Sequence, residues 1–144
     1  MDNSFTPKAS LPELLIEQSN RRGFAAGHNQ TLLWSGLGKD GVGGFQAFAR
    51  ANGGTTLEMT AGGRYLDDLN LFGADSPLTI AESLQVWANG SRQFARGASG
   101  QVRAVTGQVR PSSQYRTIEL PELLANPNVT GIDELSLLPN VGIR

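Results

Sequence analysis

Two positions in this chain combine a reactive side chain with a pattern that predicts its direction, and Ser91 is the first. Ser91 falls between Trp87 and Phe94 on an apolar stripe that follows the i, i+4, i+7 spacing of one helix face. A hydroxyl on such a stripe either bonds back to its own helix or points at another polar group. Ser91, with Trp87 beside it, is therefore a candidate member of a polar site.

Glu119 is the second such position. The segment Tyr115–Leu120 alternates like a β-strand, with Ile118 and Leu120 on one face. Glu119 then lies on the opposite face, and Pro121 ends the strand directly after Leu120. The pattern predicts a carboxylate near the C-terminal end of a strand, where open α/β sheets place their ligands.

The composition excludes several other kinds of site. The chain has 144 residues, a formal net charge of -1, no Cys and one His. Disulfides, thiolate catalysis and Cys-based metal sites are therefore excluded, and His28 alone is too few for a zinc site built on two or three imidazoles. We expect no metal. The absence of a basic block argues against a nucleic-acid partner. No apolar run approaches the ~20 residues of a membrane span, so no stable membrane association is expected.

The predicted elements that position these residues are helices at first, and then alternating strands and helices. The patterns predict helices over 11–20, 79–95 and 121–125, and strands over 102–109, 115–120 and 129–135. Thr79 and Glu82 form a capping box for the second helix. This order indicates an α/β fold, with a helical N-terminal half packed on a small, mostly parallel β-sheet with flanking helices. The length fits one domain, 1–144, whose residues 1–30 form an N-terminal helical region.

Three further features have ordinary structural interpretations that compete with functional ones. Residues 36–41 match G-x-G-x-x-G, but Gly43 and Gly44 break the long helix that a dinucleotide-binding loop requires. Asp67 and Asp68 suit a solvated turn or a helix cap, and two adjacent carboxylates are too few to indicate a metal. His28 suits a solvated loop.

Five short motifs, taken in order, resemble the ADP-ribosyl cyclase / NAD glycohydrolase family. They are Leu32-Leu33-Trp34-Ser35; Thr56-Leu57-Glu58-Met59-Thr60 with Gly63, Leu66 and Asp67-Asp68-Leu69; Val86-Trp87; Ser91-Arg92 with Phe94-Ala95; and Thr117-Ile118-Glu119-Leu120. The resemblance covers residues 31–136, the cyclase-like catalytic region, and leaves 1–30 outside it. The glycine-rich stretch after Trp34 departs from the helix expected there. Animal members are rich in disulfides, and this chain resembles instead a bacterial offshoot that serves as the C-terminal toxin domain of large exported proteins.

The chemistry of NAD cleavage fits these residue types. The leaving nicotinamide already carries positive charge, so no general acid is needed to expel it. One carboxylate can bond the ribose hydroxyls and stabilise an oxocarbenium-like sugar, and aromatic faces can stack on a flat cationic ring. The resemblance assigns roles by matched position: Glu119 as the catalytic carboxylate, Trp34 and Trp87 as stacking residues, Ser91 at the phosphates, Glu58 at the nicotinamide amide, and Asp67 and Phe94 as further substrate-binding residues.

The resemblance thus implies an NAD glycohydrolase, with or without ADP-ribosyl cyclase activity, that acts as an interbacterial toxin by depleting NAD. NAD is the substrate, and no cofactor is implied. Such a protein would be exported as the C-terminal part of a larger chain, would act in the cytosol of a target bacterium, and would need a cognate immunity protein. The absence of Cys suits work in a reducing cytosol.

Two alternatives stay open: a non-catalytic binding domain of the same fold, and a nuclease toxin. From composition alone, Trp34 and Trp87 are ordinary core residues, and Glu119 is an exposed carboxylate at the end of a strand. The ordered set of motifs is what favours the enzyme.

Overall fold

A small parallel sheet forms one part of the molecule. The structure, a computed structural model, describes residues 10–35, 47–107 and 113–136. The three strands of the sheet lie in the order β1-β2-β3, and both neighbouring pairs are parallel. They are β1 (Leu32–Ser35), β2 (Gly100–Thr106) and β3 (Val129–Ser136). Parallel neighbours need long crossover connections, and helices lie in both of them. The predicted α/β fold with a small parallel sheet is confirmed.

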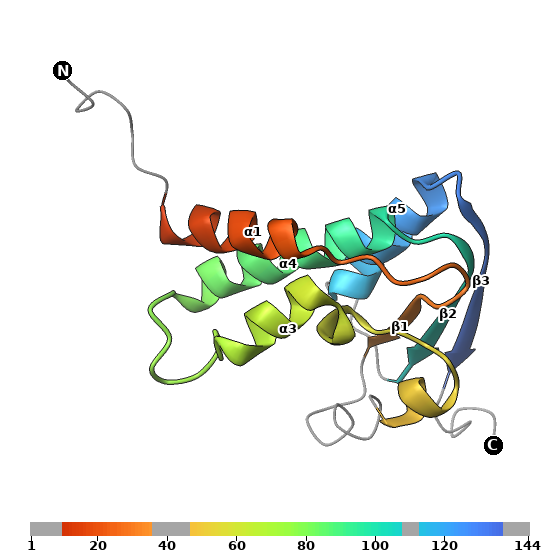
Figure 1. Cartoon of the computed structure of the whole chain (residues 1–144), viewed down its shortest axis with the longest axis horizontal. Coiled ribbons are helices and arrows are strands. Elements are labelled where there is room, and N and C mark those ends of the chain that lie inside the picture. The colour runs from red at the N-terminus through yellow and green to blue at the C-terminus, as the bar shows by residue number, and fades with distance from the viewer. Residues whose placement is uncertain (1–9, 36–46, 108–112, 137–144) are drawn as a thin grey trace, which may run out of the picture.

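The helices form a layer beside this sheet (Figure 1). Helix α1 packs against both α3 and α4. The helical segments with both ends in the described residues are α1 (Leu11–Arg22), the 3₁₀ turn η2 (Leu57–Met59), α3 (Ala61–Asp68), α4 (Ile80–Arg96), the π-helical turn η3 (Tyr115–Glu119) and α5 (Leu120–Ala125). Residues 47–51 are helical as well. Capping boxes start two of these helices, with Thr79 and Glu82 at α4 as predicted, and Ser10 and Glu13 at α1.

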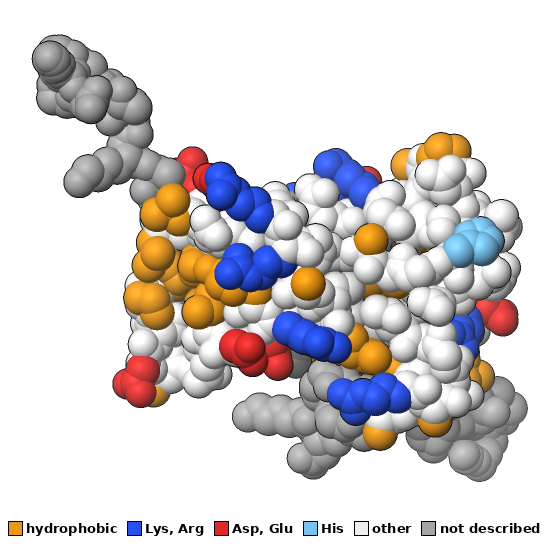
Figure 2. Space-filling view, viewed as in Figure 1, with side chains coloured by type: hydrophobic (Ala, Val, Ile, Leu, Met, Phe, Trp, Pro, Cys, Tyr) orange, Lys and Arg blue, Asp and Glu red, His pale blue; other side chains and the backbone are white. Residues whose placement is uncertain are grey.

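The first half of α4 buries a different stripe from the predicted one. Ser83, Val86 and Gly90 are buried. Ile80 and Leu84, which precede Trp87 and Phe94 on the predicted stripe, are 71% and 48% exposed. Apolar side chains accordingly gather on the surface where α1 and α4 begin (Figure 2). The predicted row that contains Trp87 and Ser91 runs along the edge of the buried face, and that edge borders the cavities described below.

The segment Tyr115–Leu120 is helical, so the predicted strand there is wrong. Tyr115 and Glu119 are both buried, and the row continues to the buried Leu123 of α5. Spacing of i, i+4, i+8 is that of one helix face. The β-branched pair Thr117 and Ile118 favoured a strand, but tertiary packing selects the helical period.

Pro121 does not end this segment and instead lies in the first turn of α5. Proline lacks the N–H that an α-helix interior would bond to the carbonyl four residues earlier. The chain accommodates it through a π turn, in which the Leu120 N–H donates to the Tyr115 carbonyl. Such π turns recur at functional sites, and this one carries Glu119.

Candidate active site

Glu119 lies on the wall of a cavity of about 220 Å³, which we call the inner cavity. Trp34 reaches it from β1, Glu58 from η2 and Ser91 from α4. Trp34 and Ser35 are the last residues of β1, so the cavity lies at the carboxyl end of a strand, where α/β sheets place ligands. Glu119 itself comes from the helical turn η3 and not from a strand end.

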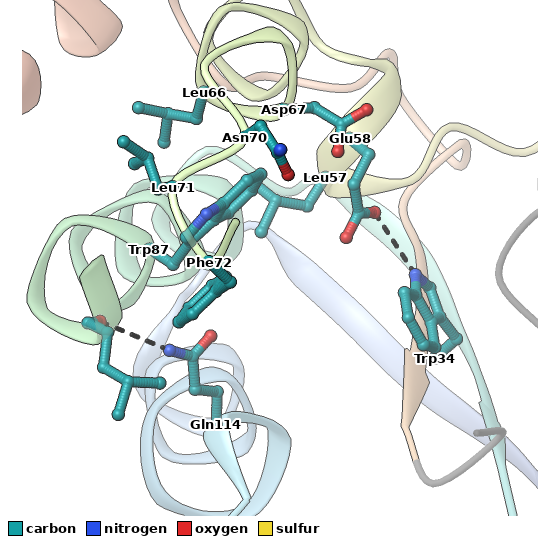
Figure 3. A pocket seen from close by; sticks show the side chains of 11 residues that line it. Trp34, Leu57, Glu58, Leu66, Asp67, Asn70, Leu71, Phe72, Trp87 and Gln114 are labelled. Carbon is teal, nitrogen blue, oxygen red and sulfur yellow. Dashed lines mark hydrogen bonds between the residues drawn. The ribbon is translucent and has the colours of Figure 1, made fainter. Parts of the chain in front are cut away.

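A second space of about 400 Å³, the outer cavity, adjoins the first. Trp34, Glu58 and Gln114 belong to both walls, so the two cavities lie side by side. Figure 3 shows Glu58 and Asp67 together on one side of the outer cavity, with Trp87 across from them. Its size falls within the about 300–1,000 Å³ typical of ligand sites.

Trp34 and Glu58 are joined by a hydrogen bond. The indole Nε1 of Trp34 donates to Glu58 Oε1 at 3.2 Å. Burial raises the pKa of the Glu58 carboxyl, the bond from Trp34 opposes that rise, and the nearby charge of Asp67 adds to it. Two carboxyl groups on one wall give the outer cavity a negative character that favours a cationic ligand.

Glu119 is only 6% exposed. Burial raises the pKa of its carboxyl to about 8, the charge of Glu58 adds to this rise, and a hydrogen bond from Ser91 opposes it. Strongly perturbed carboxyls in a cavity are typical of functional sites. A carboxylate buried on this wall can stabilise a developing cation.

Two hydrogen bonds hold the surroundings of Glu119 in place. Ser91 Oγ donates to Gln114 Oε1 at 2.9 Å. The Tyr115 hydroxyl donates to Glu134 Oε2 of β3 at 2.6 Å, and burial, reinforced by this bond, raises the pKa of Tyr115 well above its usual range. The neutral phenol therefore ties the helical turn that carries Glu119 to the edge strand of the sheet.

The structure brings together all but one of the predicted site residues. Phe94 is fully buried in the core and lines neither cavity, which gives it a packing role and no place in the site. The others line at least one of the two cavities: Trp34, Glu58, Asp67, Trp87, Ser91 and Glu119.

Sequence reasoning missed Gln114 and Tyr115, which both line the inner cavity. Tyr115 precedes Glu119 by one helical turn, a signal that the strand interpretation of this segment concealed. Asn70 and Phe72 of the outer wall were also missed. They follow α3 in an irregular stretch, where no periodic pattern predicts the direction of a side chain.

Two sequence candidates remain. The G-x-G-x-x-G stretch at 36–41 is outside the described residues. His28 lies on an exposed loop with its Nδ1 3.1 Å from Ser99 Oγ, and it lines neither cavity. Within the described ranges, no group of three or more His, Asp or Glu side chains could hold a metal ion. No described helix is long and apolar enough to cross a membrane.

Comparison with known proteins identifies structures of similar fold. The sequence matches no protein-family model and no curated protein. Aplysia cyclase complexed with its substrate NGD and product cGDPR is 23% identical, with a TM-score of 0.59 over 78% of this chain and 50% of that chain. A Glu-to-Ala mutant of ADP-ribosyl cyclase is 19% identical, with a TM-score of 0.58 over 76% and 50%. ADP-ribosyl cyclase complexed with N1-cIDPR is 19% identical, with a TM-score of 0.57 over 90% and 66%.

The chain therefore has a fold that resembles the ADP-ribosyl cyclase fold, and it spans about half the length of the first two of these structures.

Proposed function

We propose that this chain is an NAD glycohydrolase that breaks the bond between nicotinamide and ribose. One observation carries the proposal: a buried carboxyl, Glu119, faces a cavity that adjoins a second one with aromatic and acidic walls. The fold similarity to ADP-ribosyl cyclases supports an NAD-related reaction.

The two cavities suit the two sides of the bond to be broken. The nicotinamide ring of NAD is flat and cationic, so it fits the outer cavity, where Trp87 offers an aromatic face. Glu58 and Asp67 add negative charge on the same wall. The attached ribose then lies in the inner cavity beside Glu119, with the Ser91 hydroxyl available to bond it or the adjoining phosphate.

In the proposed reaction the C1′–N bond breaks, and its electron pair passes to the ring nitrogen. Nicotinamide therefore leaves as a neutral molecule, and C1′ gains oxocarbenium character. The Glu119 carboxylate stabilises that charge and bonds the ribose hydroxyls. Water then forms the new bond to C1′ and releases one proton, which gives ADP-ribose. Attack by an adenine nitrogen in place of water would give a cyclic product, the cyclase outcome.

Product analysis tests this proposal. The purified protein is incubated with NAD, and the products are separated by chromatography. We expect nicotinamide and ADP-ribose in equal amounts, and a cyclic ADP-ribose peak would identify cyclase activity. Release of nicotinamide no faster than in a protein-free control would refute the activity.

A biological role as an interbacterial toxin follows from the motif resemblance and the absence of Cys. In this role the chain is exported as the C-terminal part of a larger protein and depletes NAD in the cytosol of a target bacterium. Expression in a bacterial cytosol should lower cellular NAD and stop growth, whereas Glu119→Gln expressed to the same level should permit growth. Normal growth and NAD content with the parent chain would contradict this role.

A toxin of this kind also needs an immunity protein in its producer. Blocking the outer cavity is the most direct way to inhibit the enzyme, and the exposed Phe72 and Leu84 on its wall offer apolar contacts. Acidic groups of the inhibitor would face Arg64 or Arg116, both of which are exposed. The product of a neighbouring reading frame should bind the protein and restore growth; failure of each neighbouring product to do so would remove this part of the proposal.

A further inference from the structure

Three polar side chains form a row along the inner cavity: Glu119, Ser91 and Gln114. Ser91 is 1% exposed, and its Oγ donates to Gln114 Oε1 at 2.9 Å. The other end of the Gln114 amide is oriented by the main chain of α4, since Nε2 faces the Leu84 carbonyl oxygen at 3.5 Å. This leaves the carbonyl end of the amide toward Ser91. Ser91 and Glu119 line the same cavity, and donation of a hydrogen bond by Ser91 lowers the pKa of the Glu119 carboxyl.

A serine hydroxyl carries one hydrogen and two acceptor lone pairs. Gln114 Oε1 is only an acceptor, so in this arrangement it takes the one hydrogen that Ser91 has. While Gln114 holds this hydrogen, Ser91 can offer the Glu119 carboxyl only a lone pair, because the bond that lowers the pKa of Glu119 needs the same hydrogen. A lone pair is a good partner for a protonated carboxyl group, which donates, but a poor one for a carboxylate, which only accepts.

We propose that Gln114 is a positioning residue: it competes with the Glu119 carboxylate for the single hydroxyl hydrogen of Ser91 and so favours the protonated form of Glu119. When Glu119 ionises, the Ser91 hydroxyl rotates toward it and the bond to Gln114 is lost. The consequence for catalysis rests on the proposed NAD cleavage, in which Glu119 acts as the carboxylate. The competition for the hydrogen does not depend on that activity.

Burial and other charged groups also affect the pKa of Glu119, and Gln114 does not change their contributions. Burial and the charge of Glu58 on η2 both raise the pKa of Glu119. Tyr115 is engaged with Glu134, and Arg92 and Arg96 are paired with Glu122. The titratable or charged groups on the elements around Glu119 are Glu58 on η2, Glu82, Arg92 and Arg96 on α4, Tyr115 and Arg116 on η3, Glu122 on α5, and Asp133 and Glu134 on β3.

The test is a double-mutant cycle read by carbon NMR titration of the Glu119 carboxyl, whose signal is assigned by its loss in Glu119→Gln. Gln114→Met keeps the length of the side chain but removes the carbonyl acceptor. With the competitor gone, Ser91 can donate to the carboxylate, so the pKa of Glu119 should fall by about one unit, the size expected for one hydrogen bond to a charged group. In the Ser91→Ala background, the same Gln114→Met change should move the pKa by less than about 0.3 unit, because no hydroxyl remains to redirect.

Gln85→Met, on the exposed face of α4, is the matched control and should leave the titration unchanged. The acid limb of the kcat/KM profile for NAD should shift in parallel with the NMR value, because that profile reports groups of the free enzyme. An unchanged pKa in Gln114→Met, or an equal shift with and without Ser91, would overturn the positioning role. Absence of NAD cleavage would overturn the proposed function alone, since the titration requires no substrate.

Discussion

At the scale of single residues, the effect of the Glu119 negative charge on turnover can be tested directly. Glu119→Gln keeps the shape of the side chain and removes the negative charge. The charge matters most in the transition state, so the turnover number for NAD should fall at least ~100-fold, or roughly 2.7 kcal/mol in barrier height. Binding of NAD should persist, because Trp34 and Trp87 remain. Steady-state kinetics and calorimetric binding would measure the two effects.

Glu122→Gln is the matched control for this prediction. Glu122 forms exposed ion pairs with Arg96 at 3.0 Å and Arg92 at 3.9 Å, and such surface pairs contribute at most about 1 kcal/mol to stability. Turnover should stay within about twofold of the parent rate. A folded Glu119→Gln protein that matches the parent rate would remove Glu119 from the mechanism.

The buried Glu119 should also make stability depend on pH. Its pKa is raised to about 8 in the folded protein, while in the unfolded chain a glutamate titrates near ~4.3. Between these values the folded state holds a proton that the unfolded state has released, so the free energy of unfolding falls as pH rises and the fall ends near the folded-state pKa. The slope is at most about 1.4 kcal/mol per pH unit.

Glu119→Gln cannot titrate at this position. Its free energy of unfolding should therefore exceed that of the parent by an amount that increases from about pH 5 to about pH 8 and then stays constant. Urea unfolding of both proteins across this range measures the difference. Stability curves that run parallel throughout would mean that the Glu119 carboxyl ionises in the folded protein as readily as in water.

At the scale of elements, the contact between η2 and α3 positions Glu58. Gly63 in the first turn of α3 lies against the Leu57 carbonyl of η2, and a Cβ there would overlap that carbonyl oxygen. Replacing a helical glycine by alanine ordinarily stabilises a helix. Gly63→Ala should instead lower the free energy of unfolding by about 1–3 kcal/mol and raise the KM for NAD, because η2 carries Glu58 and must move. Urea unfolding and steady-state kinetics measure the two effects.

Gly97→Ala provides the comparison. Gly97 ends α4 with ordinary right-handed angles, and a Cβ there would find its nearest neighbour at 3.4 Å. Its stability and KM should stay close to those of the parent, within about 0.5 kcal/mol for unfolding. If Gly63→Ala proved as mild as Gly97→Ala, the η2–α3 contact would not hold Glu58 in place.

At the scale of the whole molecule, the fold is maintained without covalent cross-links. The chain has no Cys, and its core includes side chains from η2, α3, α4, the sheet, the turn that carries Glu119, and α5. After unfolding in urea and dilution, the protein should regain its full NAD-cleaving rate equally well with and without dithiothreitol. Recovery assays in the two buffers measure this, and recovery that depended on the redox state of the buffer would contradict it.

Local patterns in the sequence identify those features of the fold that depend on neighbouring residues. The capping box of Thr79 and Glu82 starts α4 as expected because its bonds join residues three apart. The strands predicted over 102–109 and 129–135 correspond to β2 and β3, except that residues 108–109 lie outside the described ranges. The roles expected of Trp34, Glu58 and Glu119 came from the order of the short motifs and their resemblance to a known family, because the residue types alone suit an ordinary core and surface.

Tertiary structure alone decides how those groups meet. Thr117 and Ile118 favour a strand locally, but packing of Tyr115 and Glu119 against the core selects a helix. The pKa of Glu119 depends on burial and on Glu58, which is far away in the chain. Gln114 joins Ser91 only because η3 packs on α4. Short-range patterns carry no information about such contacts, because the free energy that selects them comes from burial between segments distant in sequence.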